Sequence, residues 1–235
     1  MPRHAVIVAH GQPSDPAPAE ATLGELAAAV RNQLPGWTVA GATLAQPGRL
    51  AEAIGDRKDA LIFPFFMSDG WFINHVLPRD AEKSGVAPQQ ILRPFGCMAA
   101  SHALAADIAA DAAKAFGHPV RDTTLILAAH GSGRSRNPAQ VAAETAAAIG
   151  SRMAFRDIRL GFIEEAPYLD AAAQDTDARS LCLPLFVGRW GHVEKDIPAA
   201  LERAGFAGHC LDPIGCHASV PAIVAEALAS ANANG

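Results

Sequence analysis

Two histidines and one acidic residue stand directly after strand-like apolar runs in the second half of the 235-residue chain. His130 follows the first run of that half, Glu164 follows the second, and His192 lies in the loop after the third. Because ligands of open parallel sheets bind beyond the carboxyl ends of the strands, we expect these side chains to converge. Imidazole and carboxylate suit divalent iron, cobalt, nickel and zinc, and histidine also exchanges protons near neutral pH. The pattern predicts an open metal site that can also accept protons.

The first half of the chain carries histidines at corresponding places but lacks the acidic residue. His10 and His75 match the histidines of the second half, whereas Leu44 aligns with Glu164. Glu165 follows Glu164, and only one of the two can point inward, so we select Glu164 from the alignment of the halves. We therefore place catalysis in the second half and treat His10 and His75 as secondary or remnant metal ligands.

Aromatic and basic residues near these positions suit a large, flat and acidic substrate. Arginines in a glycine-rich loop before a helix can hold carboxylates, together with free backbone N–H groups. Tryptophans beside glycines in the loops after the third strand of each half can line an apolar wall. The candidate substrate-binding residues are Ser132, Arg134, Arg136, Arg189, Trp190 and Trp71. The alternative is that the loop arginines are solvated charges and that the aromatic residues fill the core.

The elements that position these residues occur twice, with a register near 120 residues. Short β-branched runs alternate with helical patterns, which is typical of βα units on a parallel sheet. We predict two flavodoxin-like α/β domains, residues 1–118 and 119–235, each with a four-stranded parallel sheet flanked by helices and with a cleft between the domains. The expected strands are residues 5–9, 38–44, 60–66 and 90–93, then 124–129, 158–163, 180–187 and 209–212. Residues 99–115 and 219–231 are the expected closing helices.

Composition limits the partners of the chain. A formal net charge of -5 leaves no basic stripe for a phosphate backbone, so nucleic acid is excluded as a partner. No apolar run reaches the length of a membrane span, and we expect a cytoplasmic protein. The four cysteines lack CxxC spacing, which favours reduced, structural thiols. With both units on one chain, we expect a monomer.

Three motifs resemble the class II tetrapyrrole chelatases, in particular two-unit sirohydrochlorin cobaltochelatases and their ferrochelatase relatives. They are AHGS with a basic loop (residues 129–136), GFIEEAP (161–167) and PLFVGRWGHVEKDIP (184–198). The resemblance spans both halves, although the first half departs from it with AHGQPSDP and an apparent three-residue insertion before His75.

The resemblance implies a lyase that inserts a divalent metal into sirohydrochlorin without nucleotide hydrolysis. His130 and His192 then act as metal ligands and bases, with Glu164 as the acidic helper. We expect Co²⁺ as the metal substrate, in cobalamin biosynthesis, and no organic cofactor. Insertion of Fe²⁺ for siroheme is the alternative within the enzyme class, because both ions accept these ligands. A non-catalytic carrier of tetrapyrrole or metal is the alternative outside it.

Overall fold

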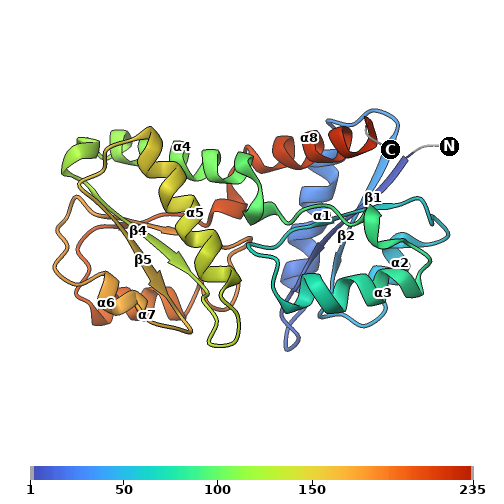
Figure 1. The fold of residues 1–235 in the computed structure, drawn as a ribbon, viewed down its shortest axis with the longest axis horizontal. Helices are drawn as coiled ribbons and strands as arrows, with labels where there is room; N and C mark the ends of the chain where they lie inside the picture. Colours follow the sequence, from blue (N-terminus) through green and yellow to red (C-terminus); the bar gives the residue numbers. More distant parts are fainter. Residues whose placement is uncertain (1–2, 234–235) are drawn as a thin grey trace. The chain divides into compact units, whose positions relative to one another are not determined.

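The computed structural model describes residues 3–233, which form two compact α/β units (Figure 1). Unit 1 comprises the chain up to Phe95 together with the segment from Ala218 onward, and unit 2 comprises Gly96–His217. The cleft expected between the two units stays a prediction. The predicted α/β class with parallel sheets is confirmed in both units.

Unit 2 contains a parallel sheet of four strands in the order β5-β4-β6-β7, as the sequence predicts. Every residue of the central strand β4 is buried, which is the pattern of a strand covered on both faces. Its strands are β4 (Thr124–Ala129), β5 (Asp157–Phe162), β6 (Leu181–Pro184) and β7 (His209–Cys210). Its helices are α4 (Ala99–Ala115), α5 (Asn137–Arg152), α6 (Leu169–Ala172) and α7 (Asp196–Arg203), with 3₁₀ turns at Val120–Asp122 and Ile214–Cys216.

Unit 1 contains a parallel sheet of three strands in the order β2-β1-β3. The strands are β1 (Arg3–Ala9), β2 (Trp37–Thr43) and β3 (Leu61–Pro64). The helices are α1 (Ala17–Arg31), α2 (Arg49–Ile54), α3 (Leu77–Lys83) and α8 (Val220–Ala233), with a π-helix at Phe72–Val76 and 3₁₀ turns at Pro88–Gln90 and Phe95–Cys97.

The prediction of a fourth strand in the first half, at residues 90–93, is wrong. Only an isolated bridge joins Ile62 to Ile91. Prolines confine the segment, because Pro88 opens a 3₁₀ turn and Pro94 follows directly after residue 93. Proline has no N–H to donate to a ladder, so too few residues remain to extend the pairing.

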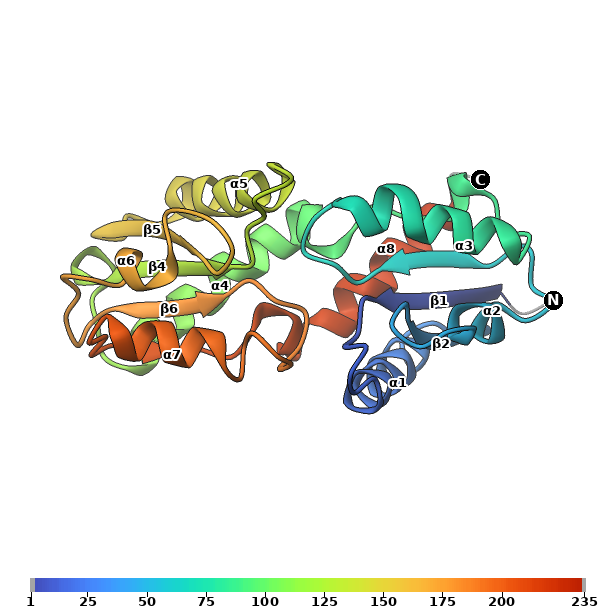
Figure 2. The same ribbon diagram turned by 90° about the horizontal axis from the view of Figure 1, so that it is seen from below.

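The two closing helices are exchanged relative to the predicted boundary at residues 118 and 119. Helix α4 packs against α5 and β6 of unit 2, and α8 packs against α1 and β3 of unit 1 (Figure 2). Small residues on α4, including Ala109 and Ala113, are fully buried in this packing. Because the repeated halves offer similar surfaces, a closing helix fits either copy, and the repeat alone cannot show which copy it joins.

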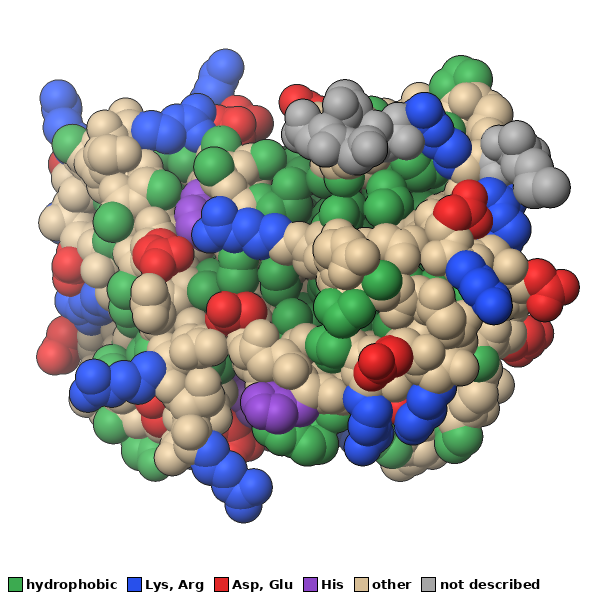
Figure 3. All heavy atoms as spheres, turned by 45° about the vertical axis from the view of Figure 1, so that its right-hand side comes forward, with side chains coloured by type: hydrophobic (Ala, Val, Ile, Leu, Met, Phe, Trp, Pro, Cys, Tyr) green, Lys and Arg blue, Asp and Glu red, His purple; other side chains and the backbone are tan. Residues whose placement is uncertain are grey.

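No helix within residues 3–233 is long and apolar enough to cross a membrane. On the face shown in Figure 3, basic and acidic side chains are interspersed, and neither sign occupies a large continuous area. This distribution agrees with the small net charge of the chain.

The close approach of α1 to β2 predicts opposite effects of two glycine substitutions. A Cβ at Gly41 would lie 2.7 Å from the backbone oxygen of Leu23, whereas a Cβ at the exposed helix residue Gly24 would meet nothing within 4 Å. We expect Gly41→Ala to lower the free energy of unfolding by about 1–3 kcal/mol through overpacking. Gly24→Ala should raise it by about 0.5–1 kcal/mol. Urea denaturation of both variants measures the difference, and equal effects would contradict the packing described.

Candidate functional site

His130 and His192 lie in contact at the carboxyl ends of the strands of unit 2. His130 follows the buried central strand β4, and His192 lies between β6 and α7. The centroids of the two imidazole rings are 4.6 Å apart, and the ring planes are nearly perpendicular at 88°. The convergence of these two histidines therefore agrees with the position expected from the sequence.

One hydrogen bond fixes the tautomer of each imidazole. Nδ1 of His130 lies 2.8 Å from the carbonyl oxygen of Gly131, and Nδ1 of His192 lies 2.6 Å from Oδ2 of Asp196. A carbonyl or carboxylate oxygen only accepts, so Nδ1 is the donor in both rings. In the neutral rings Nε2 then carries the lone pair, and neither Nε2 has a hydrogen-bond partner within residues 3–233. Such hydrogen-bonded histidines are typical of metal ligands and bases.

Asp196, which holds His192, was not among the residues predicted from the sequence. Asp196 is the first residue of α7, and its backbone N–H donates to the carbonyl oxygen of His192 at 3.0 Å. This turn places the two side chains one helical turn apart, at positions i and i+4. The spacing within GHVEKD was the available signal, because residues four apart on a helix face each other.

Glu164 does not join the two histidines in a metal-binding group of three. Among the described residues, no group of three or more His, Cys, Asp or Glu is placed to hold a metal ion. Glu164 is exposed, and its backbone N–H donates to the carbonyl oxygen of His130 at 2.9 Å. The neighbouring Glu165 turns toward the loop after β4, where its Oε1 accepts the N–H of Ser132 at 2.8 Å. The structural reason is that β5 ends at Phe162, so the alternation of a strand no longer determines the direction in which the Glu164 and Glu165 side chains point.

The alignment of Leu44 with Glu164 also needs correction. Ala9 pairs with Thr43 in unit 1, and Ala129 pairs with Phe162 in unit 2. Counting onward from these pairs, Glu164 corresponds to Ala45, and Glu165 corresponds to Gln46. Unit 1 therefore has no carboxylate at either position.

The loop after His130 has a fixed backbone and exposed arginines. Gly131 has a φ of 72°, and a Cβ there would lie 2.9 Å from the Glu165 side chain. Ser132 Oγ accepts backbone N–H groups from Arg134 and Ser135, each at 3.2 Å, so this hydroxyl shapes the loop. Arg134 and Arg136 are exposed, and neither guanidinium has an ion pair within residues 3–233. Of the loop residues predicted to bind substrate, the two arginines keep free donors.

The loop before His192 holds the other predicted substrate contacts of unit 2. Arg189 forms a two-bond ion pair with Asp212, at 2.9 Å from Nε and 2.7 Å from a terminal nitrogen. This pairing raises the pKa of Arg189 and lowers that of Asp212. The Trp190 ring lies over Gly188, where a Cβ would come within 2.6 Å of the indole. Arg189 is thus already bound to a carboxylate, and Trp190 lies on the loop backbone.

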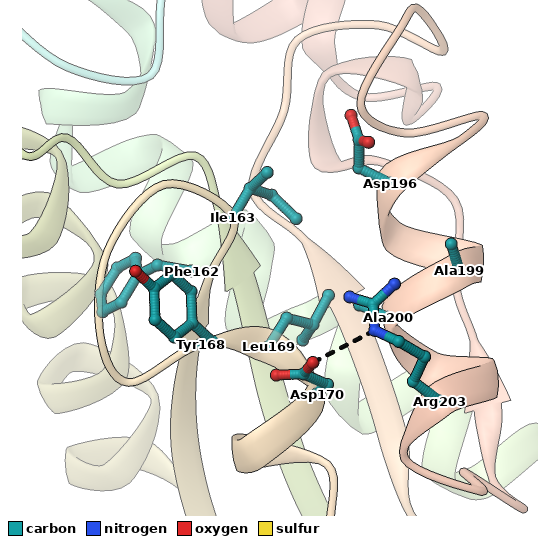
Figure 4. A pocket seen from close by; sticks show the side chains of 9 residues that line it. All are labelled: Phe162, Ile163, Tyr168, Leu169, Asp170, Asp196, Ala199, Ala200 and Arg203. Carbon is teal, nitrogen blue, oxygen red and sulfur yellow. Dashed lines mark hydrogen bonds and ion pairs between the residues drawn. The ribbon is translucent and has the colours of Figure 1, made fainter.

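A pocket of about 230 Å³ lies beside Asp196, between the segment after β5 and α7 (Figure 4). Its wall is about equally polar and apolar, and Arg203 reaches across it to an ion pair with Asp170 at 3.2 Å. The lining residues, none of them predicted to bind substrate, are Phe162, Ile163, Tyr168, Leu169, Asp170, Asp196, Ala199, Ala200 and Arg203. The pocket shares Asp196 with the histidine pair.

The histidines of unit 1 have different neighbours. His10 packs against Phe72 with ring centroids 4.1 Å apart, and the exposed His75 stacks on Trp71 at 6.2 Å. His75 lies in the π-helix Phe72–Val76, which accommodates extra residues in the chain. Trp71 is 61% exposed, so it does not belong to the core of unit 1.

Comparison with known proteins assigns the family. The family model CbiX matches residues 124–231. The chain is similar to a solved structure described as "CbiX, the terminal Enzyme for Biosynthesis of Siroheme in Denitrifying Bacteria". The two share 44% identity over 97% of this chain and 99% of that chain, with a TM-score of 0.90. No curated protein matches the chain.

Two more distant structures share the fold alone. SirB from Bacillus subtilis, solved with Fe³⁺, is 13% identical over 100% of this chain and 97% of its own, with a TM-score of 0.76. DR2241 from Deinococcus radiodurans, described as structurally similar to chelatases with two additional domains, is 21% identical, with a TM-score of 0.72. The match covers 97% of this chain and 55% of the DR2241 chain.

The parallel α/β units and the histidine pair at the strand ends are those of a class II tetrapyrrole chelatase. Within that class, the chain belongs to the CbiX family.

The tautomer fixed by Asp196 predicts the effect of replacing this carboxylate by an amide. In Asp196→Asn the amide can donate to Nδ1, which moves the imidazole proton to Nε2 and removes the free lone pair. We expect the affinity for Co²⁺, measured by titration calorimetry, to fall about 10–100-fold. Asp170→Asn is the matched control, because Asp170 is also in the first turn of a helix and lines the same pocket. Equal Co²⁺ affinities of the two variants would contradict the role of Asp196.

Proposed function

We propose that this protein inserts a divalent metal ion into sirohydrochlorin and that unit 2 performs the reaction. The observation that carries the proposal is the His130 and His192 pair, whose Nδ1 atoms are engaged and whose Nε2 atoms are left for a metal or a proton. Membership of the CbiX family supports it, as does the 44% identity to a protein described as the terminal enzyme of siroheme biosynthesis.

Two imidazole bases match the proton balance of the reaction. A free-base tetrapyrrole loses two pyrrole N–H protons when its nitrogens take up a divalent metal ion. Nε2 of His130 and of His192 can each ligate the arriving metal or accept one of these protons. The Asp196 carboxylate stabilises the imidazolium that forms at His192, and the Gly131 carbonyl oxygen keeps the His130 ring oriented. Exposed Glu164, whose backbone binds that of His130, is proposed to pass protons to solvent.

The exposed guanidinium groups of Arg134 and Arg136 suit the carboxylates of an acidic tetrapyrrole. Both residues stand in the loop after His130, close in sequence to the proposed base. Arg189 is bound to Asp212 and would have to exchange that partner for a substrate carboxylate. We therefore propose Arg134 and Arg136 as the main contacts for substrate carboxylates, with Trp190 as an apolar contact.

We propose Fe²⁺ as the metal substrate, and the support for this choice comes from a relative because the ligands do not distinguish Fe²⁺ from Co²⁺. Imidazole and carboxylate accept both ions. The relative that shares 44% identity is described for siroheme biosynthesis. This description supports Fe²⁺, whereas the resemblance of the motifs alone led us to expect Co²⁺ and cobalamin biosynthesis.

His130→Ala is expected to lower the initial rate of metal insertion at least about 100-fold, because it removes a ligand and base. His10→Ala, the matched variant of unit 1, should keep most of the rate. The absorbance change of sirohydrochlorin under anaerobic conditions gives both rates, with Fe²⁺ and Co²⁺ assayed in parallel. The reverse pattern would move the site to unit 1. Binding of one equivalent without acceleration over the protein-free control would replace the enzyme by a carrier.

Arg134→Ala combined with Arg136→Ala should raise KM for sirohydrochlorin about tenfold or more while leaving kcat within a factor of a few. This is the result expected when contacts to non-reacting carboxylates are lost equally from the ground state and the transition state. Arg121→Ala is the control, because this arginine is highly exposed and also lies in unit 2. An unchanged KM in the double variant would show that the loop arginines are solvated charges only.

A further inference from the structure

Two cysteines of unit 2 occupy neighbouring positions on adjacent parallel strands. Cys182 of β6 pairs in register with Cys210 of β7. Register partners project to the same face of a sheet, and adjacent strands lie about 4.8 Å apart. A disulfide spans Cα separations of about 4.4–6.8 Å, so this spacing is within reach of an S–S bond.

The two thiols differ in access to solvent. Cys182 is fully buried in a core cluster beneath α7, together with Ile126, Ile197 and Leu201. Cys210 lies on the edge strand of the sheet and is exposed. A soluble oxidant therefore reaches Cys210 first. The buried thiol of Cys182 is its neighbour on the adjacent strand.

The pKa values of the two thiols are shifted in opposite directions. The hydrogen bond from Cys182 lowers the pKa of the Cys210 thiol. The same hydrogen bond, and burial after it, raise the pKa of the Cys182 thiol well above its ordinary value. Because the thiolate is the nucleophile, Cys210 is the thiol suited to attack a peroxide. The resolving role falls to Cys182 through its position, since it is the register partner of Cys210.

We propose that Cys182 and Cys210 form a redox-active dithiol, which a peroxide closes to an intramolecular disulfide. The Cys210 thiolate attacks one peroxide oxygen, the O–O bond breaks, and a sulfenic acid and one water form. The Cys182 sulfur then attacks the Cys210 sulfur, and its proton leaves with the hydroxyl group as a second water. The thiols lose two electrons and two protons in total, and the peroxide is reduced to water.

The other two cysteines lack these features. Cys97 is buried, and Cys216 is partly buried with a pKa raised chiefly by burial. We therefore keep the expectation of a structural role for Cys97 and Cys216. For Cys182 and Cys210 the proposal replaces it. The proposal does not depend on the function proposed above.

The dithiol lies close to the loop that carries His192. Two residues beyond Cys210, Asp212 holds Arg189 through two hydrogen bonds, at 2.9 and 2.7 Å. Arg189 stands three residues before His192 in the loop that follows β6. Both strands that carry the thiols therefore lead directly into the segments joined by this ion pair.

The test is peptide mapping of the folded full-length chain after treatment with hydrogen peroxide. Trypsin places Cys182 in the peptide 180–189 and Cys210 in the peptide 204–235, which also contains Cys216. Oxidation should lower the intact mass by about 2 Da, the mass of two hydrogens, and join these two peptides. The variant Cys97→Ala combined with Cys216→Ala should behave like wild type, and dithiothreitol should reverse the change.

Cys210→Ser should abolish the joined peptides, and Cys182→Ala should leave Cys210 as a stable sulfenic acid that a dimedone-type probe captures. Joined peptides in wild type, with fragment ions that place the link on Cys210 and not on Cys216, support the proposal without any variant, so a variant that fails to fold does not remove the test. A disulfide between two chains, a joined pair that uses Cys216, or oxidation of Cys210 alone in wild type would each overturn it. No reaction of the folded chain would overturn it as well.

Discussion

The hydrogen bond between His192 Nδ1 and the Asp196 carboxylate is the interaction on which the site depends. The His192 side chain is 39% exposed, so packing alone does not hold the imidazole in one orientation. Asp196 is held because it opens α7, and the next residue, Ile197, is fully buried in the core of unit 2. The packing of α7 on the sheet thereby determines which nitrogen of an exposed ring carries the proton.

The two units show how the same strand ends can give different sites. In unit 2 one helical turn separates His192 from its carboxylate. In unit 1 the residue four positions after His75 is Arg79, and the following Asp80 is bound to Lys83 and Arg79. The Lys83 ammonium, and to a smaller extent the Arg79 guanidinium, lower the pKa of the Asp80 carboxyl group. His75 stacks on Trp71 instead of facing a carboxylate, so the insertion before it changed its neighbours and not only its position.

The strand-end histidines could be predicted because buried parallel strands are continuous apolar runs and their carboxyl ends share one edge. Asp196 was missed because the motif GHVEKDIP runs into a helix whose first residue had not been located. Glu164 was chosen over Glu165 by its alignment with Leu44, which the strand pairing shifts by one residue, and strand alternation does not decide between them because β5 stops at Phe162. The exchange of α4 and α8 was beyond prediction, because sequence repeats record which segments are alike and not which of them pack together.

Two imidazoles without a third ligand suit a site that must release its metal. Structural metal sites bind tightly because four protein ligands close the coordination shell, whereas sites that react keep positions open. The proposed ligands that lie together are His130 and His192, so a metal ion held by them would keep positions open for water and for the pyrrole nitrogens of the proposed substrate. A third protein ligand held in place would make each exchange from protein to ring more costly. The hydrogen bonds at Nδ1 of both rings supply the orientation that two proposed ligands alone would lack.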